Sequence, residues 1–222
     1  MDSSIYLDIG NSNAKWKFEG EYFETSTNDF ILDELPKSSK IWVSNVSSNF
    51  VINSQSNILL VKSQKRYKSL INSYDEPSLL GSDRWLAMIA SHEYSPNTSF
   101  IVVDIGTAIT IDVVDKNGLH LGGVIYPGLS EIRKIFDFPV SNHAHVNEVS
   151  SSTINAWSTG TLEIIVNGIN QKIHELNHAV PNANIFLTGG GFDNVEKFLN
   201  FPYGYHKNLV LDGLELFADN MR

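Results

Sequence analysis

Residues 8–13 read Asp-Ile-Gly-Asn-Ser-Asn, and residues 104–110 read Asp-Ile-Gly-Thr-Ala-Ile-Thr. Each stretch follows a short apolar run and leads into a second segment with the alternation of a half-buried strand. The order strand, Asp-Ile-Gly, polar turn, strand therefore occurs twice in the chain. This internal repeat predicts two copies of one supersecondary unit rather than a long array of repeats.

The segments around these motifs predict alternating strands and helices, which favours a mixed α/β architecture. Strands are expected at 5–9, 14–19, 40–44, 57–61, 100–103, 109–114, 119–126 and 183–187, and helices at 82–93, 153–178 and 211–220, with a short helix possible at 47–54. The break at Tyr94-Ser95-Pro96-Asn97 predicts an N-terminal half, 1–97, and a C-terminal half, 98–222. The pattern leaves open whether the last helix packs on its own half or crosses back to the first.

Composition narrows the class of protein. Of the 222 residues 42% are hydrophobic and 18% charged, as in folded globular proteins. The absence of cysteine excludes disulfides, zinc–thiolate sites and cysteine nucleophiles. The net charge of −9 disfavours sequence-independent nucleic-acid binding. No apolar run approaches the ~20 residues of a membrane helix, and the N-terminus lacks a signal-peptide pattern. We therefore expect a soluble cytoplasmic protein without nucleic-acid or membrane partners.

The repeated motif suits phosphate chemistry. Glycine in a polar turn lets backbone N–H groups approach a phosphate closely, and an aspartate at a strand end can orient Mg²⁺ or its water shell. Lys15 could reach a phosphate oxygen. Either motif alone is more often an ordinary hairpin turn. Two such turns facing each other across a cleft would grip a polyphosphate from both sides, as phosphoryl transfer requires.

Two further segments could contribute to a site. Thr188-Gly189-Gly190-Gly191 follows a predicted strand and could let a base or ribose approach, or could form a tight turn only. Gly81-Ser82-Asp83-Arg84 begins a predicted helix, where Ser82 or Asp83 could simply cap it. Alternatively, Asp83 could act as a general base and Arg84 could bind a carboxylate or phosphate. No dinucleotide-binding or P-loop glycine pattern occurs.

Taken together, these motifs resemble those of type III pantothenate kinases, within the superfamily of acetate and sugar kinases, heat-shock chaperone ATPases and actin. The matching segments are 8–12, 81–85, 104–110, 122–128 and 188–190, in the order of the family. The resemblance implies an α/β fold of two ribonuclease-H-like, actin-like ATPase halves with ATP in the cleft between them. It also implies a homodimer that phosphorylates pantothenate to 4′-phosphopantothenate, the first step of coenzyme A biosynthesis. Mg²⁺ and a monovalent cation, K⁺ or NH₄⁺, would be required.

The resemblance also assigns roles to single residues. Asp83 would accept the proton of the substrate hydroxyl, and Asp104 would help to bind the monovalent cation. ATP would be bound by Asp8, Gly10, Asn11, Ser12, Asn13, Lys15, Thr107, Gly189 and Gly190. Pantothenate would be bound by Tyr74, Gly81, Ser82, Arg84 and Thr153. Ser12 stands where the family usually has Thr, and Ser82 where Ala is usual.

Several alternatives remain open on the sequence. A kinase of the same fold could act on another small hydroxy acid or sugar, because fold does not fix substrate. A nucleotide-binding regulatory homologue could have lost catalysis, although Asp8, Asp83 and Asp104 are all present. Residues 174–178 spell the zinc-protease pattern His-Glu-x-x-His, but helical periodicity places both histidines opposite the apolar face. His143 and His145 could also bind a metal, without an evident third ligand.

Overall fold

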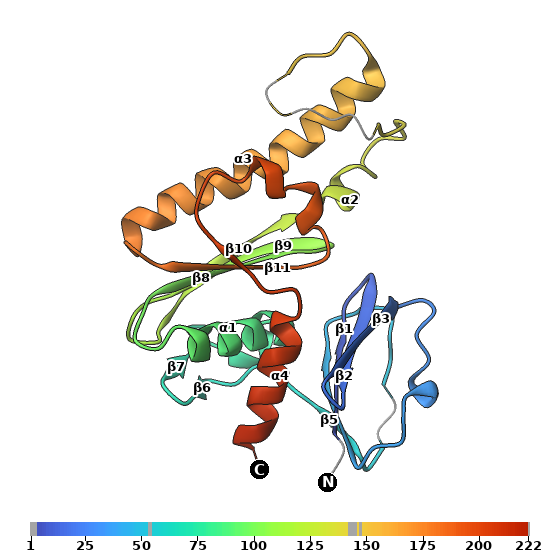
Figure 1. Cartoon of the computed structure of the whole chain (residues 1–222), viewed down its shortest axis with the longest axis vertical. Coiled ribbons are helices and arrows are strands. Elements are labelled where there is room, and N and C mark those ends of the chain that lie inside the picture. Colours follow the sequence, from blue (N-terminus) through green and yellow to red (C-terminus); the bar gives the residue numbers. More distant parts are fainter. Residues whose placement is uncertain (1–3, 53–54, 142–145, 147, 222) are drawn as a thin grey trace.

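The computed structural model describes residues 4–52, 55–141, 146 and 148–221, which form two five-stranded sheets and four α-helices (Figure 1). The first sheet has the spatial order β3 (Glu21–Ser26), β2 (Asn13–Phe18), β1 (Ser4–Ile9), β4 (Lys40–Asn45) and β5 (Ile58–Leu60). The second has the order β10 (His120–Pro127), β9 (Ala108–Val114), β8 (Phe100–Ile105), β11 (Asn184–Thr188) and β12 (Gly204–Tyr205). The mixed α/β prediction is confirmed.

The two sheets share one topology. In each, the first three strands of the unit pair antiparallel, and the two remaining strands add in parallel on the other side of the first strand. Thus β1 corresponds to β8, and the turn after each carries the Asp-Ile-Gly motif. The repeat seen in the sequence is therefore a repeat of structure.

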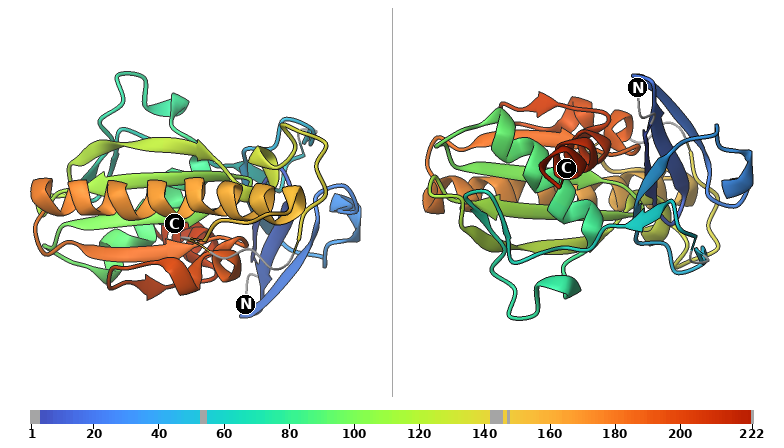
Figure 2. Two further views of the ribbon diagram at one scale, coloured as in Figure 1. Left: turned by 90° about the horizontal axis from the view of Figure 1, so that it is seen from above. Right: turned by 90° about the horizontal axis from the view of Figure 1, so that it is seen from below.

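The helices cover the sheets unequally. α3 (Thr153–Ala179) lies along one face of the second sheet, as Figure 2 also shows. α1 (Ser82–Tyr94) and α4 (Leu209–Asn220) pack against each other between the two sheets. The remaining helical pieces are α2 (Leu129–Ile132) and the 3₁₀ turns η1 (Leu32–Glu34), η2 (Pro77–Leu79), η3 (Phe192–Asn194) and η4 (Glu196–Phe198); a small hairpin joins β6 (Arg66–Tyr67) and β7 (Leu70–Ile71). No helix of the described residues is long and apolar enough to cross a bilayer.

Alternation along the central strands explains the three hydrophobic clusters. In β1, Ile5, Leu7 and Ile9 belong to the outer cluster of the first sheet, whereas Tyr6 points to the α1–α4 layer. In β8, Ile101, Val103 and Ile105 meet α3, whereas Phe100 and Val102 meet α1 and α4. Because side chains of a strand point alternately to opposite faces, each central strand is buried on both sides. The α1–α4 layer is thus a core shared by both sheets.

α4 lies near the end of the chain but packs on structure from its beginning. It contacts β1, β2 and β4 as well as α1. Lys17 on β2 donates to Glu215 at 2.6 Å, and the hydroxyl of Tyr67 donates to the carbonyl of Leu216. The closing helix therefore crosses back onto the first sheet.

Two expectations about the first sheet need correction. The described part of 47–54, residues 47–52, contains no helix. The amide of Ser47 donates to the side chain of Asn45, and that of Asn49 donates to Ser47 Oγ; such local bonds compete with helical ones. The edge strand β3 was not predicted, because Glu21–Ser26 is largely exposed and lacks a strong apolar pattern.

The crossing of α1 and α4 gives a stability prediction. A Cβ at Gly213 of α4 would overlap the backbone of Leu86 on α1, whereas a Cβ at Gly160 of α3 meets nothing within 4 Å. Gly213→Ala should lower the free energy of unfolding by about 1–3 kcal/mol or more, because two packed helices must separate. Gly160→Ala should raise it by about 0.5–1 kcal/mol through helix propensity. Urea denaturation of both variants provides the measurement; equal effects would contradict the helix-crossing account.

Candidate active site

A cleft of about 450 Å³ lies where the two repeated turns approach each other. The sequence-predicted residues that line it are Asp8, Gly10, Asn11, Ser12, Asn13, Lys15, Asp83, Asp104, Thr107, Gly189 and Gly190. All nine residues expected to bind ATP are in this set, together with the proposed general base and cation ligand. The fold therefore gathers into one cavity residues from four separate parts of the chain, at 8–15, 83, 104–107 and 189–190.

The two turns meet through their side chains. The Oγ of Ser12 lies 2.7 Å from Oγ1 of Thr107, which joins the β1–β2 turn to the β8–β9 turn. Within each turn a backbone bond closes the loop: Gly10 N donates to the carbonyl of Asn13, and Gly106 N donates to that of Ala108. Equivalent turns of the repeat are thus brought into direct contact.

Glycine 189 is required by packing as well as by backbone conformation. Its φ is +98°, a region that favours glycine, and a Cβ there would overlap Asp104 and Ile105. The amide of Gly191 donates to the carbonyl of Ile105 at 2.7 Å. The glycine-rich turn therefore rests directly on the end of β8 and forms one wall of the cleft.

Three carboxylates converge on the cleft. Burial, together with the neighbouring Asp83 charge, raises the pKa of Asp8 to about 7. The same two causes raise the pKa of Asp104 to about 7. Burial also raises the pKa of Asp83, although the N–H groups near the start of α1 oppose it. Removal from water, with repulsion by neighbouring carboxylates as a smaller cause, therefore disfavours the charged forms of all three acids.

A cation would suit this arrangement. Oδ1 of Asp8 is buried and has no hydrogen-bond partner among the described residues. Carboxylate oxygens are the ligands that Mg²⁺ and other hard cations prefer. A bound cation would satisfy this oxygen and favour the ionised form of Asp8; because the described residues hold no cluster of three potential metal ligands, nucleotide oxygens or water would have to complete its coordination.

Asp83 is held in place by its own helix. Its Oδ1 accepts from the amide of Arg84 at 2.8 Å in the first turn of α1. A Cβ at Gly81 would lie only 2.5 Å from this oxygen. Ser82 bonds to Ser44, whose side chain in turn hydrogen-bonds Asp8. Gly81 and Ser82 therefore shape the surroundings of Asp83, although neither lines the cleft.

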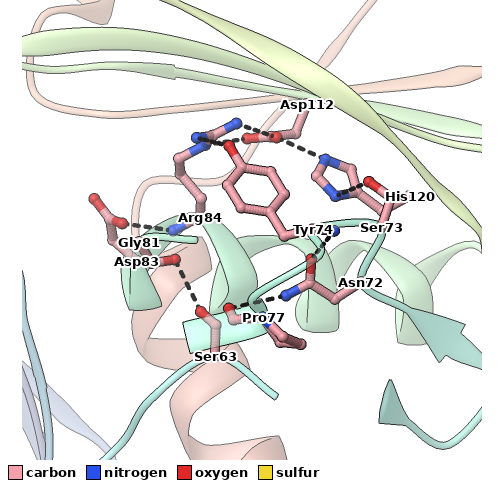
Figure 3. A network of polar contacts seen from close by, with 10 residues as sticks. All are labelled: Ser63, Asn72, Ser73, Tyr74, Pro77, Gly81, Asp83, Arg84, Asp112 and His120. Carbon is pink, nitrogen blue, oxygen red and sulfur yellow. Dashed lines mark hydrogen bonds and ion pairs between the residues drawn. The ribbon is translucent and has the colours of Figure 1, made fainter. Parts of the chain in front are cut away.

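Arg84 and Tyr74 belong to a buried network beside the cleft (Figure 3). Nε and Nη2 of Arg84 donate to the two oxygens of Asp112 at 2.8 and 2.6 Å, and Nη1 donates to the Tyr74 hydroxyl at 3.1 Å. The ring of His120 donates to Asp112 at 3.0 Å and stacks on Tyr74. Burial acts to raise the pKa of Asp112, but the bonds from His120 and Arg84 hold it below its ordinary value.

Sequence reasoning missed Asp112, His120 and Arg133. Asp112 alternates with Ile111 and Val113 in a predicted strand, so the sequence gives it the place of an ordinary solvent-facing polar residue, and its partners come from distant segments. His120 follows a turn and carries no signal either. Arg133 lines the cleft from the end of α2, in a segment without a recognisable motif.

The remaining candidates lie elsewhere. Thr153 is exposed at the first residue of α3 and does not line the cleft, so its predicted contact with substrate stays a prediction. His174 and His178 are exposed on α3, as predicted, with ring centroids 5.1 Å apart. Glu175 is paired with Lys172, and the described residues contain no group of three potential metal ligands. A zinc-protease site is therefore unsupported; His143 and His145 lie outside the described residues.

Known proteins resemble the chain in sequence and in fold. The family model of type III pantothenate kinases matches residues 4–176. A type III pantothenate kinase from Hahella chejuensis is 32% identical over 234 residues, which cover 96% of each chain. A solved structure of a conserved Campylobacter jejuni protein, assigned to the Baf family of transcriptional activators, has 26% identity and a TM-score of 0.69 over 98% of each chain. The Clostridium difficile activator of 2-hydroxyisocaproyl-CoA dehydratase, solved with ADPNP, has 13% identity and a TM-score of 0.53 over 99% of this chain and 96% of its own. The predicted fold of two ribonuclease-H-like, actin-like ATPase halves is confirmed.

The raised pKa of Asp8 predicts how stability depends on pH without ligands. The folded chain favours the protonated carboxyl, so the stability that Asp8 contributes is complete below about pH 4 and is lost as the pH rises through about 7. Asp8→Asn should therefore raise the free energy of unfolding at pH 8 by at least ~1 kcal/mol, or roughly 2–4 °C in Tm, and flatten the slope from pH 5 to 8.

Thermal unfolding in EDTA measures this effect. Asp29→Asn, which removes a charge from an exposed position, serves as the control and should leave the slope unchanged. A loss of stability in Asp8→Asn at pH 8 would show that the carboxylate is favourably solvated or paired in the free protein.

Proposed function

The chain belongs to the type III pantothenate kinase family, and on that premise we propose how its cleft phosphorylates pantothenate. The reaction transfers the γ-phosphoryl group of ATP to the substrate hydroxyl and yields 4′-phosphopantothenate, the first step of coenzyme A biosynthesis. The observation that carries the proposal is the convergence of Asp8, Asp83 and Asp104 on one cleft with the two repeated turns.

The two turns hold the polyphosphate. The backbone amides and short side chains of Gly10–Asn13, with Lys15, would contact it from the first half, and Thr107 from the second. Gly189 and Gly190 would leave room for the nucleoside. In this proposal residues 1–97 and 98–222 act as two lobes, with the cleft at their junction. The hydrogen bond between Ser12 and Thr107 supports this arrangement, because it places the turns close enough for one polyphosphate to touch both.

Asp83 receives the proton of the substrate hydroxyl as the new O–P bond forms and the bond to ADP breaks. Its position in the first turn of α1, in the same cleft as Asp8 and Asp104, supports this role. Burial raises its pKa, which makes it a better proton acceptor than an exposed carboxylate. Phosphoryl transfer is mainly a matter of positioning and charge neutralisation, so orientation of the nucleophile is the larger part of this task.

The pantothenate end of the site is placed at Tyr74, Gly81, Ser82 and Arg84. Arg84 has five N–H donors, of which three are committed to Asp112 and Tyr74. Two donors are left for a carboxylate, and Asp112 and His120 fix the direction in which they point. Thr153 would have to reach substrate from outside the cleft that the single chain forms.

The cations complete the proposal. Mg²⁺ would be held near Asp8, whose buried Oδ1 needs a partner, and the monovalent cation near Asp104. They would supply charge neutralisation of the polyphosphate. A cytoplasmic location is proposed with the activity, because the reaction consumes ATP.

A regulatory role without catalysis is the second candidate, favoured by the likeness to the Campylobacter jejuni protein. The net charge of −9 argues against direct nucleic-acid binding, and the three cleft aspartates are all retained. A kinase for another hydroxy acid or sugar is a third. Release of ADP that depends on added pantothenate would separate these functions.

The catalytic prediction concerns Asp83. Asp83→Asn should lower kcat at least about 100-fold while ATP binding stays near normal, because the amide keeps the shape but cannot accept the proton. ADP release is measured with saturating ATP, pantothenate, Mg²⁺ and K⁺, and wild-type turnover should fail when Mg²⁺ is omitted or K⁺ is replaced by Na⁺. Asp29→Asn serves as the surface control. Near-normal turnover of Asp83→Asn would remove Asp83 from this role.

A homodimer is proposed from family membership, with the exposed apolar side chains of α3 as its contact. Ile154 is 41% and Ile164 60% exposed, and Ile164 borders a small apolar hollow with Tyr126 and Pro127 of β10. Ile164→Asp should shift the protein to monomer in sedimentation velocity, whereas Asn28→Asp, at an exposed position that follows β3, should not. A wild-type monomer at micromolar concentration would contradict this part of the proposal.

A further inference from the structure

We propose that Arg133 binds the polyphosphate of ATP and is a nucleotide-contacting residue of this cleft. The inference rests on the proposed ATP-dependent function and adds a residue to it that no motif indicated. It follows from three observations about Arg133: its place in the cleft, the way its guanidinium is oriented, and the absence of a counter-charge.

Arg133 is carried into the cleft by α2. This short helix follows β10, and the amide of Gly128 donates to the carbonyl of Thr107 at 2.8 Å. A Cβ at Gly128 would overlap Gly106, so the start of α2 is pressed against the second of the two repeated turns. Leu129, Ser130 and Arg133 line the cleft as a result. The arginine therefore shares one cavity with the turns that would hold the polyphosphate.

Its guanidinium is oriented by uncharged groups. Nε donates to Oγ1 of Thr161 and Nη2 to the carbonyl of Ser158, both at 3.1 Å and both on α3. Thr161 is itself fixed, because its hydroxyl donates to the carbonyl of Trp157 at 2.8 Å. These bonds use one edge of the guanidinium, and Nη1 has no hydrogen-bond partner among the described residues. The guanidinium is thus oriented before any ligand binds, and its Nη1 donors are not used within the described structure.

No carboxylate compensates its charge. Within residues 4–52, 55–141, 146 and 148–221, no acidic side chain lies within ion-pair distance of Arg133. Burial alone acts on it and lowers its pKa. Arg84, by contrast, has Asp112, and Lys15 in the same cleft has Glu24 at 3.8 Å. A half-buried guanidinium without a counter-charge favours an anionic ligand, and its planar donors match phosphate oxygens.

The geometry favours the nucleotide over pantothenate as the source of that anion. Tyr74 and Arg84, the residues placed at the pantothenate carboxylate, do not line the cleft that holds Arg133. The residues that share the cleft with Arg133 include both repeated turns and the glycine-rich turn. The phosphates of ATP are therefore the anion assigned to Arg133.

The test compares Arg133→Gln with Lys134→Gln. Both substitutions remove one positive charge from adjacent positions, but Lys134 is 69% exposed and paired with Glu131. Arg133→Gln should raise the KM for ATP roughly 10- to 100-fold at saturating pantothenate, the range of a charge-assisted hydrogen bond. The KM for pantothenate should stay unchanged, and the ATP KM should become less sensitive to salt. Lys134→Gln should change neither KM by more than about twofold.

Direct binding separates this inference from the proposed function. Calorimetric titration of ADP and Mg²⁺, without pantothenate, should show the same loss of affinity in Arg133→Gln even if pantothenate proved not to be the substrate. Thr161→Val keeps the charge and removes one orienting acceptor, so it should weaken ADP binding to a smaller degree. A rise in the pantothenate KM alone, or unchanged ADP affinity in a folded Arg133→Gln, would overturn the assignment.

Discussion

The rest of the structure depends on one constraint, which is the burial of three aspartates in a single cleft. Their removal from water disfavours the charged form of each carboxyl group. Asp8 lies near the end of β1, and Asp104 occupies the corresponding position near the end of β8. Asp83 lies in the first turn of α1, the helix packed between the two sheets. Burial raises the pKa of each, and Oδ1 of Asp8 has no partner in the described structure. The arrangement costs stability in the free protein, and in the proposed function it would be relieved by cations that accompany the nucleotide. The site is therefore built for a ligand that brings positive charge with it.

The repeated fold explains how these acids meet. Each sheet ends its central strand in an Asp-Ile-Gly turn, and the shared α1–α4 layer holds the two sheets so that Ser12 and Thr107 touch. α4 is essential to this geometry, because it crosses from the C-terminal half to pack on β1, β2 and β4. Gly189 and Gly213 contribute to the same geometry. Each allows a close contact with the backbone of a neighbouring element, and a Cβ atom at either position would block that contact.

The sequence could predict the parts of the structure that depend on local pattern. The two turns, the strands beside them and the buried face of α3 follow from periodicity and from the repeat. The sequence indicated only one apolar side of α1, whereas Arg84 to Ser91 are buried all round because the helix lies between two sheets. Asp112 and His120 could not be assigned, because their partners come from distant segments, and Arg133 becomes notable only once the absence of a counter-charge is seen. Burial and the lack of a charged partner depend on tertiary structure, which the local sequence pattern does not encode.

The central claim is that the two turns and the three acids act on one polyphosphate. A crystal structure with a non-hydrolysable ATP analogue, Mg²⁺ and K⁺ tests it most directly. The account predicts phosphates lying between the turn at Gly10–Asn13 and the turn at Thr107, with Asp83 facing the terminal phosphate across the space left for the second substrate. Phosphates bound outside this cleft, or turns that separate without touching them, would contradict it.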